Sequence, residues 1–298
     1  PSSPATALSK QADEGVQATH AYLMHQNNYQ GQGIKVGVVD FGYAHYQTLL
    51  NKNVVPQPKK TMKFYGTQST NQLDMTGNST VHGSATAEVI YSVAPKAEFY
   101  LAQVGDGQGR ASDSDVINAI DWMVSQGVNI INFSGGGHDK ALDGTAFLDK
   151  KIDQISRQNI LWVNAAGNEG NKHWIGKIQD NNGNGFIDTG LDDDVLLLNQ
   201  SQDGGMSILV NWDDWQGSKR GSQGIDVDAF LLTQNANGQM VLVATADEPR
   251  TRGSNATEIM TGRLPKGQYY LVLKSDKSAD KNVHVLVQGI LLDPSYRK

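Results

Sequence analysis

The chain has 298 residues, a net charge of −6 at pH 7, 32 glycines and no cysteine. Its acidic balance argues against a nucleic acid or an anionic membrane as partner, and the lack of cysteine excludes disulfides and thiolate metal sites. No apolar run reaches the ~20 residues that span a bilayer. Because the chain begins at Pro1 and carries no signal peptide, we expect a processed product of a secreted or periplasmic parent.

The first half of the chain predicts strands and helices in alternation. Short β-branched runs are typical of strands buried on both faces, and longer amphipathic runs are typical of helices. The expected strands cover residues 33–39, 97–104, 128–133 and 160–164, and the expected helices cover residues 12–28, 84–93, 112–125 and 142–157. Ser112 or Ser114 is expected to cap the third helix. This alternation predicts an α/β fold with a doubly wound parallel sheet.

The second half of the chain has a different character. A polar, glycine-rich segment at residues 180–188 is followed by short alternating stretches, separated by turn signals such as Asn237-Gly238. The stretches are residues 194–198, 206–212, 225–233, 240–245, 268–274 and 283–290. Their spacing predicts an antiparallel β-sandwich. We therefore expect two domains, residues 1–172 and residues 173–298.

Polar residues follow three of the predicted strands. Asp40 ends the first strand, a Ser-Gly-Gly-Gly loop begins at Ser134, and Asn168 follows the strand at 160–164. Sites in parallel sheets form at the carboxyl ends of the strands, so these residues are candidates for one site. Each has an ordinary structural alternative, since an aspartate at a strand end often only caps a turn. The glycine-rich loop lacks the Lys-Ser/Thr that a phosphate-binding loop would carry.

Three motifs in order carry a family resemblance. They are Val38-Val39-Asp40, His82-Gly83-Ser84 before a small-residue helix, and AAGNEG at residues 165–170. Asp, His and Asn in this order resemble the subtilisin-like serine proteases (subtilases). The resemblance implies that His82 is the general base, that Asp40 orients it, and that Asn168 donates a hydrogen bond to the oxyanion.

The resemblance extends to the substrate-binding loops and to the second domain. Ser134, Gly135 and Gly136 resemble the family's Ser-Leu-Gly-Gly, whose backbone pairs with an extended polypeptide substrate. Glycine at 135, where leucine is common, is expected to widen the pocket. Gly105, Asp106 and Gly107 would flank the other side of the substrate. The predicted sandwich resembles the jelly-roll domain that some bacterial subtilases carry between the asparagine and the serine.

The sequence departs from the family at several points. Phe41 stands where the family usually has threonine, and Ala85 replaces a second histidine outside the triad. No Gly-Thr-Ser motif follows Asn168. Ser254 begins a partial mimic, Ser-Asn-Ala-Thr, but Pro265 would stop the long helix that a nucleophilic serine needs.

We therefore expect a serine endopeptidase whose nucleophile lies in a C-terminal segment that truncation or proteolysis has removed. The chain alone is expected to be inactive. Two alternatives stay open at this point, namely a catalytically dead pseudoprotease and a calcium-dependent peptide- or protein-binding module.

The segment at residues 180–188 resembles a calcium-binding loop of the EF-hand type. Asp180, Asn182, Asn184 and Asp188 stand at its positions 1, 3, 5 and 9, and Phe186 offers its carbonyl at position 7. Position 12 is leucine rather than glutamate, although three aspartates follow it directly. A solvated acidic turn is the alternative. We expect a structural calcium ion.

Overall fold

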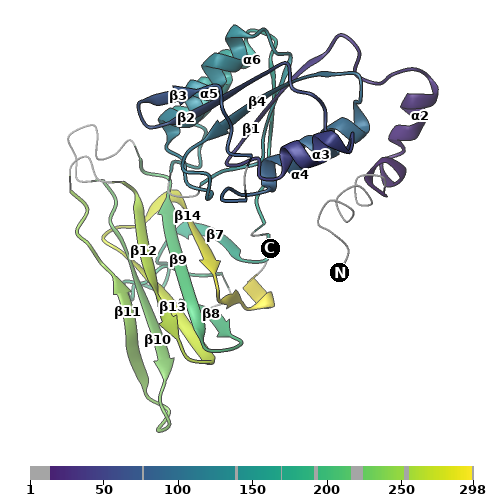
Figure 1. Ribbon diagram of the computed structural model, residues 1–298. Coiled ribbons are helices and arrows are strands. Elements are labelled where there is room, and N and C mark those ends of the chain that lie inside the picture. The colour runs from purple at the N-terminus through teal and green to yellow at the C-terminus, as the bar shows by residue number, and fades with distance from the viewer. Residues whose placement is uncertain are drawn as a thin grey trace. The chain divides into compact units, whose positions relative to one another are not determined.

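The computed structural model describes residues 14–75, 77–137, 140–168, 170–190, 194–215, 224–251 and 255–296 (Figure 1). The chain forms two compact units. The first comprises the chain up to residue 136 together with residues 147–166, and the second comprises residues 137–146 and the chain from residue 167 onward. The domain boundary at residue 172 stays a prediction.

The first unit contains a six-stranded sheet that is parallel except at one edge. Its order is β3-β2-β4-β1-β5-β6, and only β3 runs antiparallel to its neighbour. The strands are β1 (Lys35–Asp40), β2 (Lys60–Tyr65), β3 (Gln68–Thr70), β4 (Glu98–Val104), β5 (Ile130–Phe133) and β6 (Leu161–Asn164). All residues of β1 after Lys35 are buried, as expected for a central strand covered on both faces.

Helices cover both faces of this sheet, which confirms the predicted doubly wound α/β fold (Figure 1). The helices are α2 (Ala21–Gln26), α3 (Tyr46–Asn51), α4 (His82–Val93), α5 (Asp113–Ser125) and α6 (Phe147–Ser156). One core lies under α5 and α6, and the other lies under α3 and α4. No helix in the described ranges has the length and apolar character needed to cross a membrane.

Two helix predictions illustrate how local signals act. The predicted cap at Ser112 is present as a capping box, in which the Ser112 side chain and the Asp115 side chain each accept from the other's backbone N–H. The helix predicted over residues 12–28 is interrupted, because Thr19 and His20 form a turn in which His20 has φ 58°. This turn separates α2 from the helical residues 14–18.

The second unit is an antiparallel sandwich of two sheets. One sheet has the order β11-β10-β13-β8-β15 and the other has the order β12-β9-β14-β7. The elements are β7 (His173–Ile178), β8 (Val195–Gln200), β9 (Gly204–Trp212), β10 (Val227–Gln234), β11 (Met240–Ala246), β12 (Thr257–Leu264), β13 (Gly267–Ser275), β14 (Ala279–Gln288), β15 (Leu291–Leu292) and a 3-10 helix at Pro294–Tyr296.

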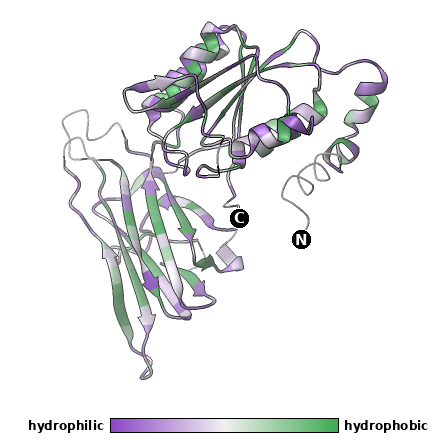
Figure 2. Ribbon diagram, in the orientation of Figure 1, coloured by the Kyte–Doolittle hydropathy of each residue, from purple (hydrophilic) through white to green (hydrophobic). Residues whose placement is uncertain are grey.

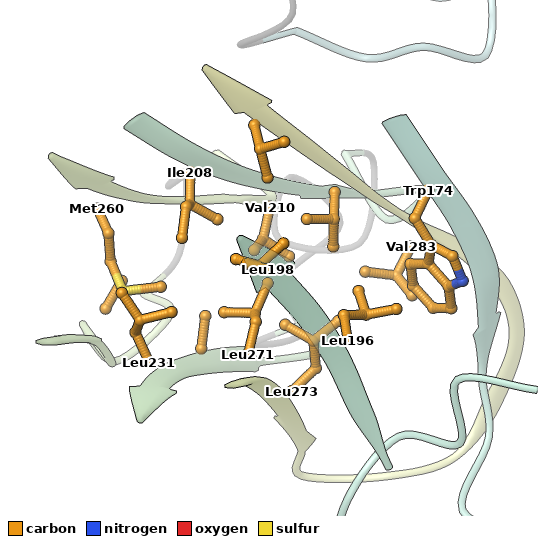
Figure 3. Packing of buried hydrophobic residues seen from close by; sticks show 14 of the residues in the cluster. Trp174, Leu196, Leu198, Ile208, Val210, Leu231, Met260, Leu271, Leu273 and Val283 are labelled. Carbon is orange, nitrogen blue, oxygen red and sulfur yellow. The ribbon is translucent and has the colours of Figure 1, made fainter. Parts of the chain in front are cut away.

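Side chains from both sheets meet in a single apolar core, which Figure 3 shows. Every second residue is buried in β8 and in the first part of β10, so that Leu196, Leu198 and Leu231 point from one sheet toward the other. Ile208 and Val210 of β9 meet them from the opposing sheet. This alternation is the period-2 pattern on which the prediction rested. The predicted α/β domain followed by a β-sandwich is therefore confirmed.

Candidate functional site

Asp40 and His82 come together at the carboxyl end of the central strand. Asp40 is the last residue of β1 and is fully buried, whereas His82 is the first residue of α4. The His82 Nδ1 atom lies 2.8 Å from Oδ2 and 3.0 Å from Oδ1 of Asp40. The Asp40 carboxylate also accepts from the backbone N–H of Phe41 at 2.8 Å and from the Thr86 hydroxyl at 3.4 Å. These donors compensate a buried negative charge.

Two glycines allow this approach. A Cβ atom at Gly42 would lie 2.7 Å from the backbone nitrogen of Thr80, and one at Gly83 would lie 2.7 Å from the Gly42 carbonyl oxygen. The Gly83 N–H donates to that same carbonyl at 2.9 Å. The loop after β1 is thereby fixed against the first turn of α4. This contact places His82 over Asp40.

The geometry selects one state of the imidazole. Nδ1 donates its proton to the carboxylate, so the neutral ring has its lone pair on Nε2. The hydrogen bond to Asp40 raises the pKa of His82, although partial burial opposes the rise. The His82 side chain is 54% exposed, and among the described residues Asp40 is its only hydrogen-bond partner. The pair can therefore take up a proton at Nε2 and stabilise the resulting cation.

The predicted substrate-flanking turn lies beside this pair. Gly105 directly follows β4, the neighbour of β1, and has φ 75°. The Gly107 carbonyl accepts from the Thr80 N–H at 2.8 Å, so the turn is tied to the segment that leads into His82. Asp106 closes the turn by accepting from the backbone N–H groups of Gln108 and Arg110. These hydrogen bonds lower the pKa of Asp106, which is partly exposed.

The glycine-rich loop lies on the other side. Ser134, Gly135 and Gly136 follow β5, which pairs with β1 on the side opposite to β4. The Ser134 hydroxyl accepts from the Asn132 side chain at 3.1 Å, and the Gly135 carbonyl accepts from the Asn164 side chain at 3.3 Å. The carboxyl ends of adjacent strands thus carry Gly105, Asp40 and Ser134, and the strand pattern predicts this position for Asp40 and Ser134.

The expected wider pocket at Gly135 is corrected by the structure. A Cβ atom at this position would lie 2.7 Å from the Phe133 ring and 2.8 Å from the Phe41 ring. The two rings are 6.0 Å apart and tilted by 52°. Phe41, which replaces the family's usual threonine, therefore occupies the space that a leucine at 135 would need. Sequence reasoning noted both departures but did not connect them.

A pocket of about 340 Å³ opens between α4 and the end of β5. His82, Thr86 and Glu88 line it from the helix, and Asn132 and Ser134 line it from the strand and loop. Glu88 is buried and was not recognised in the sequence as a pocket residue. The signal for it was a lone carboxylate among small and apolar residues of the predicted helix at 84–93.

Two further residues that the sequence singled out, Asn168 and Ser254, lie outside this group of strand-end residues. Asn168 follows β6 by four residues and belongs to the second unit, so its role stays a prediction. Ser254 lies outside the described residues, but Thr257, the last residue of the partial serine motif, begins strand β12 rather than a helix. The rejection of this motif as a nucleophile agrees with that strand.

The predicted calcium loop is closed by its own amides. Oδ1 of Asp180 accepts from the backbone N–H groups of Gly183 and Asn184 at 2.6 and 3.1 Å, and Oδ2 accepts from that of Gly185 at 2.8 Å. Gly185 has φ 89°, which favours glycine at the sharp turn. The Asn184 side-chain oxygen accepts from the Phe186 N–H at 2.9 Å.

The donor set of this loop fits a hard cation. Asp180 and Asp188 supply carboxylates, and Asn182 and Asn184 supply amide oxygens. Among the described residues no three His, Cys, Asp or Glu side chains gather as a metal site. A cation here would therefore need amide and carbonyl oxygens beside the carboxylates. Residues 191–193, with position 12 of the loop and the first two of the three aspartates after it, lie outside the described part of the chain.

Comparison with known proteins gives the relationship. The sequence model of the subtilase family matches residues 31–203. Subtilisin E of Bacillus subtilis (strain 168) is 29% identical over 163 residues, which cover 52% of this chain and 40% of that protein. Subtilisin of Bacillus pumilus is also 29% identical over 163 residues, covering 52% of this chain and 55% of that protein.

Among solved structures, the Clostridium perfringens CspB protease is similar with a TM-score of 0.49 and 14% identity, over 92% of this chain and 66% of that one. The chain spans about half the length of the curated relatives that it matches, namely 40% and 55% of the two subtilisins. The family match covers more than half of the chain and includes both Asp40 and His82. The chain therefore belongs to the subtilase family.

Proposed function

We propose that the intact parent of this chain is a serine endopeptidase that hydrolyses peptide bonds through an acyl-enzyme. The observation that carries the proposal is the 2.8 Å contact between His82 Nδ1 and the buried Asp40 carboxylate. A histidine held in this tautomer accepts the serine proton at Nε2 and later returns it to the leaving amine. Asp40 keeps the ring oriented and stabilises its cation.

The remaining assignments complete the reaction. Asn168 donates a hydrogen bond to the oxyanion of the tetrahedral intermediate, which is where charge develops. The loops at residues 105–107 and 134–136 hold the substrate backbone as an added strand between them. Both loops stand at strand ends next to β1, and this position supports the assignment.

The nucleophile is proposed to lie in a C-terminal segment of the parent that docks against α4. Support comes from the first unit, where Val89 and Val93 of α4 are 53% and 42% exposed. The pocket of about 340 Å³ beside His82 adjoins the same helix. Apolar groups of this size gain roughly 1.5–3 kcal/mol each when fully buried, so a covering segment would be held by them. The parent is proposed to act outside the cytoplasm, as a secreted or periplasmic enzyme.

A fluorophosphonate probe tests this proposal. The 298-residue chain should remain unlabelled, and the full-length parent should be labelled at one serine beyond residue 298. A His82→Ala parent should lose the labelling, whereas His20→Ala, a change at an exposed histidine, should keep it. Labelling of the short chain at Ser254, or a parent that reacts nowhere, would contradict the proposal.

We also propose that the loop at residues 180–188 binds one structural calcium ion. Asp180, Asn182, Asn184, Phe186 and Asp188 would hold it, because the loop already turns around the Asp180 carboxylate. Binding to the folded loop alone stabilises by about 2.7 kcal/mol at a hundredfold excess of calcium over Kd.

A thermal melt with calcium or with chelator measures this effect. The combined Asp180→Ala and Asp188→Ala substitutions should abolish the calcium-dependent shift. Asp280→Ala, at an exposed aspartate of β14, should keep it. If the melting midpoint of the unsubstituted chain does not change with millimolar calcium, the site is excluded.

A further inference from the structure

Strand β11 (Met240–Ala246) is an exposed apolar edge of the sandwich. It ends the five-stranded sheet, and among the described residues β10 is its only pairing partner. The side chains of Met240, Val241, Leu242 and Val243 are 40–55% exposed. Because successive side chains point to opposite faces of a strand, four exposed residues in a row mean that both faces are open. Figure 2 shows the hydrophobic character of this strand.

The strand has only one of the usual protections of an edge, a bulge at Val243. Natural edge strands avoid pairing with other chains through charges, proline or bulged, short geometry. Residues 240–246 contain no charge, no proline and no glycine. Its one irregularity is a register shift opposite Leu231 and Leu232, which leaves Met240 and Val241 in regular pairing with Gln234 and Thr233. The outer edge of β11 can therefore accept a further strand.

An apolar pocket of about 470 Å³ adjoins this edge on the outer face of the sheet. Leu242, Leu232, Phe230 and Val272 line it across three adjacent strands, with Phe186 and Lys274 at its side. The register pairs Leu232 with Leu242 and Phe230 with Val272, so the apolar surface is continuous. Alternate side chains of an added strand would lie over this surface.

One end of the strand is strongly acidic. Asp247 and Glu248 follow β11 directly, and Asp226 and Asp228 stand at the start of the neighbouring strand. Burial raises the pKa of Asp228, and the charges of Asp226 and Asp247 raise it further, with Lys274 as the opposing cation. Around Asp228 the neighbouring carboxylates thus outnumber the one cation, Lys274, that opposes them. A basic group would be attracted to this end.

We propose that β11 docks an extended polypeptide segment whose alternate side chains are apolar and that carries a basic side chain at one end. The segment pairs with the strand as an added strand of the sheet, and its basic side chain lies beside Asp247 and Glu248. Two copies of this chain pairing through β11 would leave both acidic ends without a cation, because the strand has no basic residue. The docking is independent of peptide-bond hydrolysis and belongs to the chain whether or not its parent cleaves.

Fluorescence anisotropy with labelled peptides of about eight residues tests the proposal on the whole chain. The first peptide alternates valine and threonine between terminal lysines, the second has glutamates instead of the lysines, and the third has proline at two central positions. The lysine peptide should bind, and the glutamate peptide should bind about tenfold more weakly, a difference of about 1.4 kcal/mol. The proline peptide should not bind, since it lacks the N–H donors that a strand supplies.

Matched variants locate the site. Leu242→Lys and Val243→Lys are both at exposed positions of β11. Each should weaken the binding of the lysine peptide by about tenfold. Ile175→Lys is the control, because Ile175 is 47% exposed on β7, an edge strand of the other sheet. Asp247→Asn combined with Glu248→Gln should remove the preference for lysine over glutamate peptides, whereas Asp153→Asn on α6 should keep it.

Three results would overturn the proposal. The first is equal binding of all three peptides, and the second is an equal loss in the β11 variants and in Ile175→Lys. The third is a dimer in sedimentation that Leu242→Lys converts to a monomer while no peptide binds, which would make a second copy the occupant. Near-ultraviolet circular dichroism of each variant must match that of the unsubstituted chain, and Val243→Lys replaces Leu242→Lys if it does not.

Discussion

Two buried carboxylates, one in each unit, have opposite surroundings. Asp40 at the end of β1 is fully buried and accepts hydrogen bonds from His82, Thr86 and the backbone of Phe41. Glu258 near the start of β12 is 8% exposed, and among the described residues its carboxyl group has no hydrogen-bond partner. Burial, together with the charges of four nearby carboxylates, raises the pKa of Glu258 to about 7.

The difference shows that burial alone does not mark a reactive carboxylate. A buried charge is costly unless donors or a cation compensate it. At Asp40 three donors converge, and the histidine among them gains the ability to carry a proton. At Glu258 the neighbouring charges have the same sign as its carboxylate. The protonated form is therefore favoured, because it avoids the free-energy cost of a buried charge. The Asp40 carboxylate orients His82, whereas the Glu258 carboxyl group makes the stability of the folded chain depend on pH.

The largest expected effect comes from removing the donor to Asp40. In the full-length parent, His82→Ala should lower kcat by several orders of magnitude, and Asp40→Asn should lower it by about 10⁴-fold because the ring adopts the wrong tautomer. Steady-state kinetics on a peptide substrate measure both. His20→Ala serves as the control, and circular dichroism should show an unchanged fold. Full activity in His82→Ala would mean that the pair has no catalytic role.

The next effect concerns the proposed oxyanion donor. Asn168→Ala in the parent should lower kcat by roughly 10²–10³-fold, which is the size of the loss for the corresponding donor in subtilisin. KM should change little, because the hydrogen bond strengthens only as the oxyanion forms. Asn159→Ala, at an exposed turn after α6, is a control for amide removal. A loss confined to KM would point to substrate binding instead.

A double-mutant cycle tests the contact between Phe41 and position 135. Gly135→Leu alone should destabilise the first unit by about 1–3 kcal/mol, the range for overpacked sites. In a Phe41→Thr background the same change should cost less, because one of the two rings that collide with the new side chain is gone. Denaturant titration gives the four free energies of unfolding. Additive costs would show that the two positions do not share this space.

The smallest effect is expected at Glu258. Its pKa in the folded state, about 7, lies above its ordinary value of 4.5, so the folded protein binds the proton more tightly than the unfolded chain. The stabilisation is fully present below about pH 4.5 and is lost as the pH rises through 7. Glu258→Gln should therefore be more stable than the unsubstituted chain at pH 8, with a smaller difference at pH 5.

Melting curves at the two pH values measure this difference. Asp153→Asn, which removes an exposed carboxylate on α6, should show no such dependence on pH. If the stability of the Glu258→Gln variant relative to the unsubstituted chain is the same at both pH values, the pKa of Glu258 is not raised in the folded state.

The same two carboxylates mark where sequence reasoning works and where it stops. Asp40 ends a continuous β-branched run, and parallel strands bring their carboxyl ends to one edge. The positions of Asp40 and Ser134 at that edge therefore follow from the order of the predicted strands, whereas Gly105 is implied by the family resemblance. The predicted contact between Asp40 and His82 is present in the structure. Its distance follows from Gly42 and Gly83, whose importance lies in steric room that no local pattern reveals.

Strands β7 and β12 escaped prediction because their alternation is inverted at particular residues. In β12 Glu258 is buried together with Met260 while Ile259 is 50% exposed, so hydropathy places Glu258 and Ile259 on the wrong faces. In β7 the Trp174 ring lies across Gly176, at 2.3 Å from where a Cβ atom would be, and Ile175 points to solvent. Such strands are held by tertiary contacts that override the local pattern.

Gly42 and Gly83 restrict how this sequence can vary. Any side chain at either position would separate the loop after β1 from α4, although neither residue takes part in a reaction. In a library of parent variants, these two positions should therefore tolerate as few replacements as Asp40 and His82 themselves. A search for active relatives gains selectivity by requiring all four residues, and an engineer who remodels the substrate loops should keep both glycines unchanged.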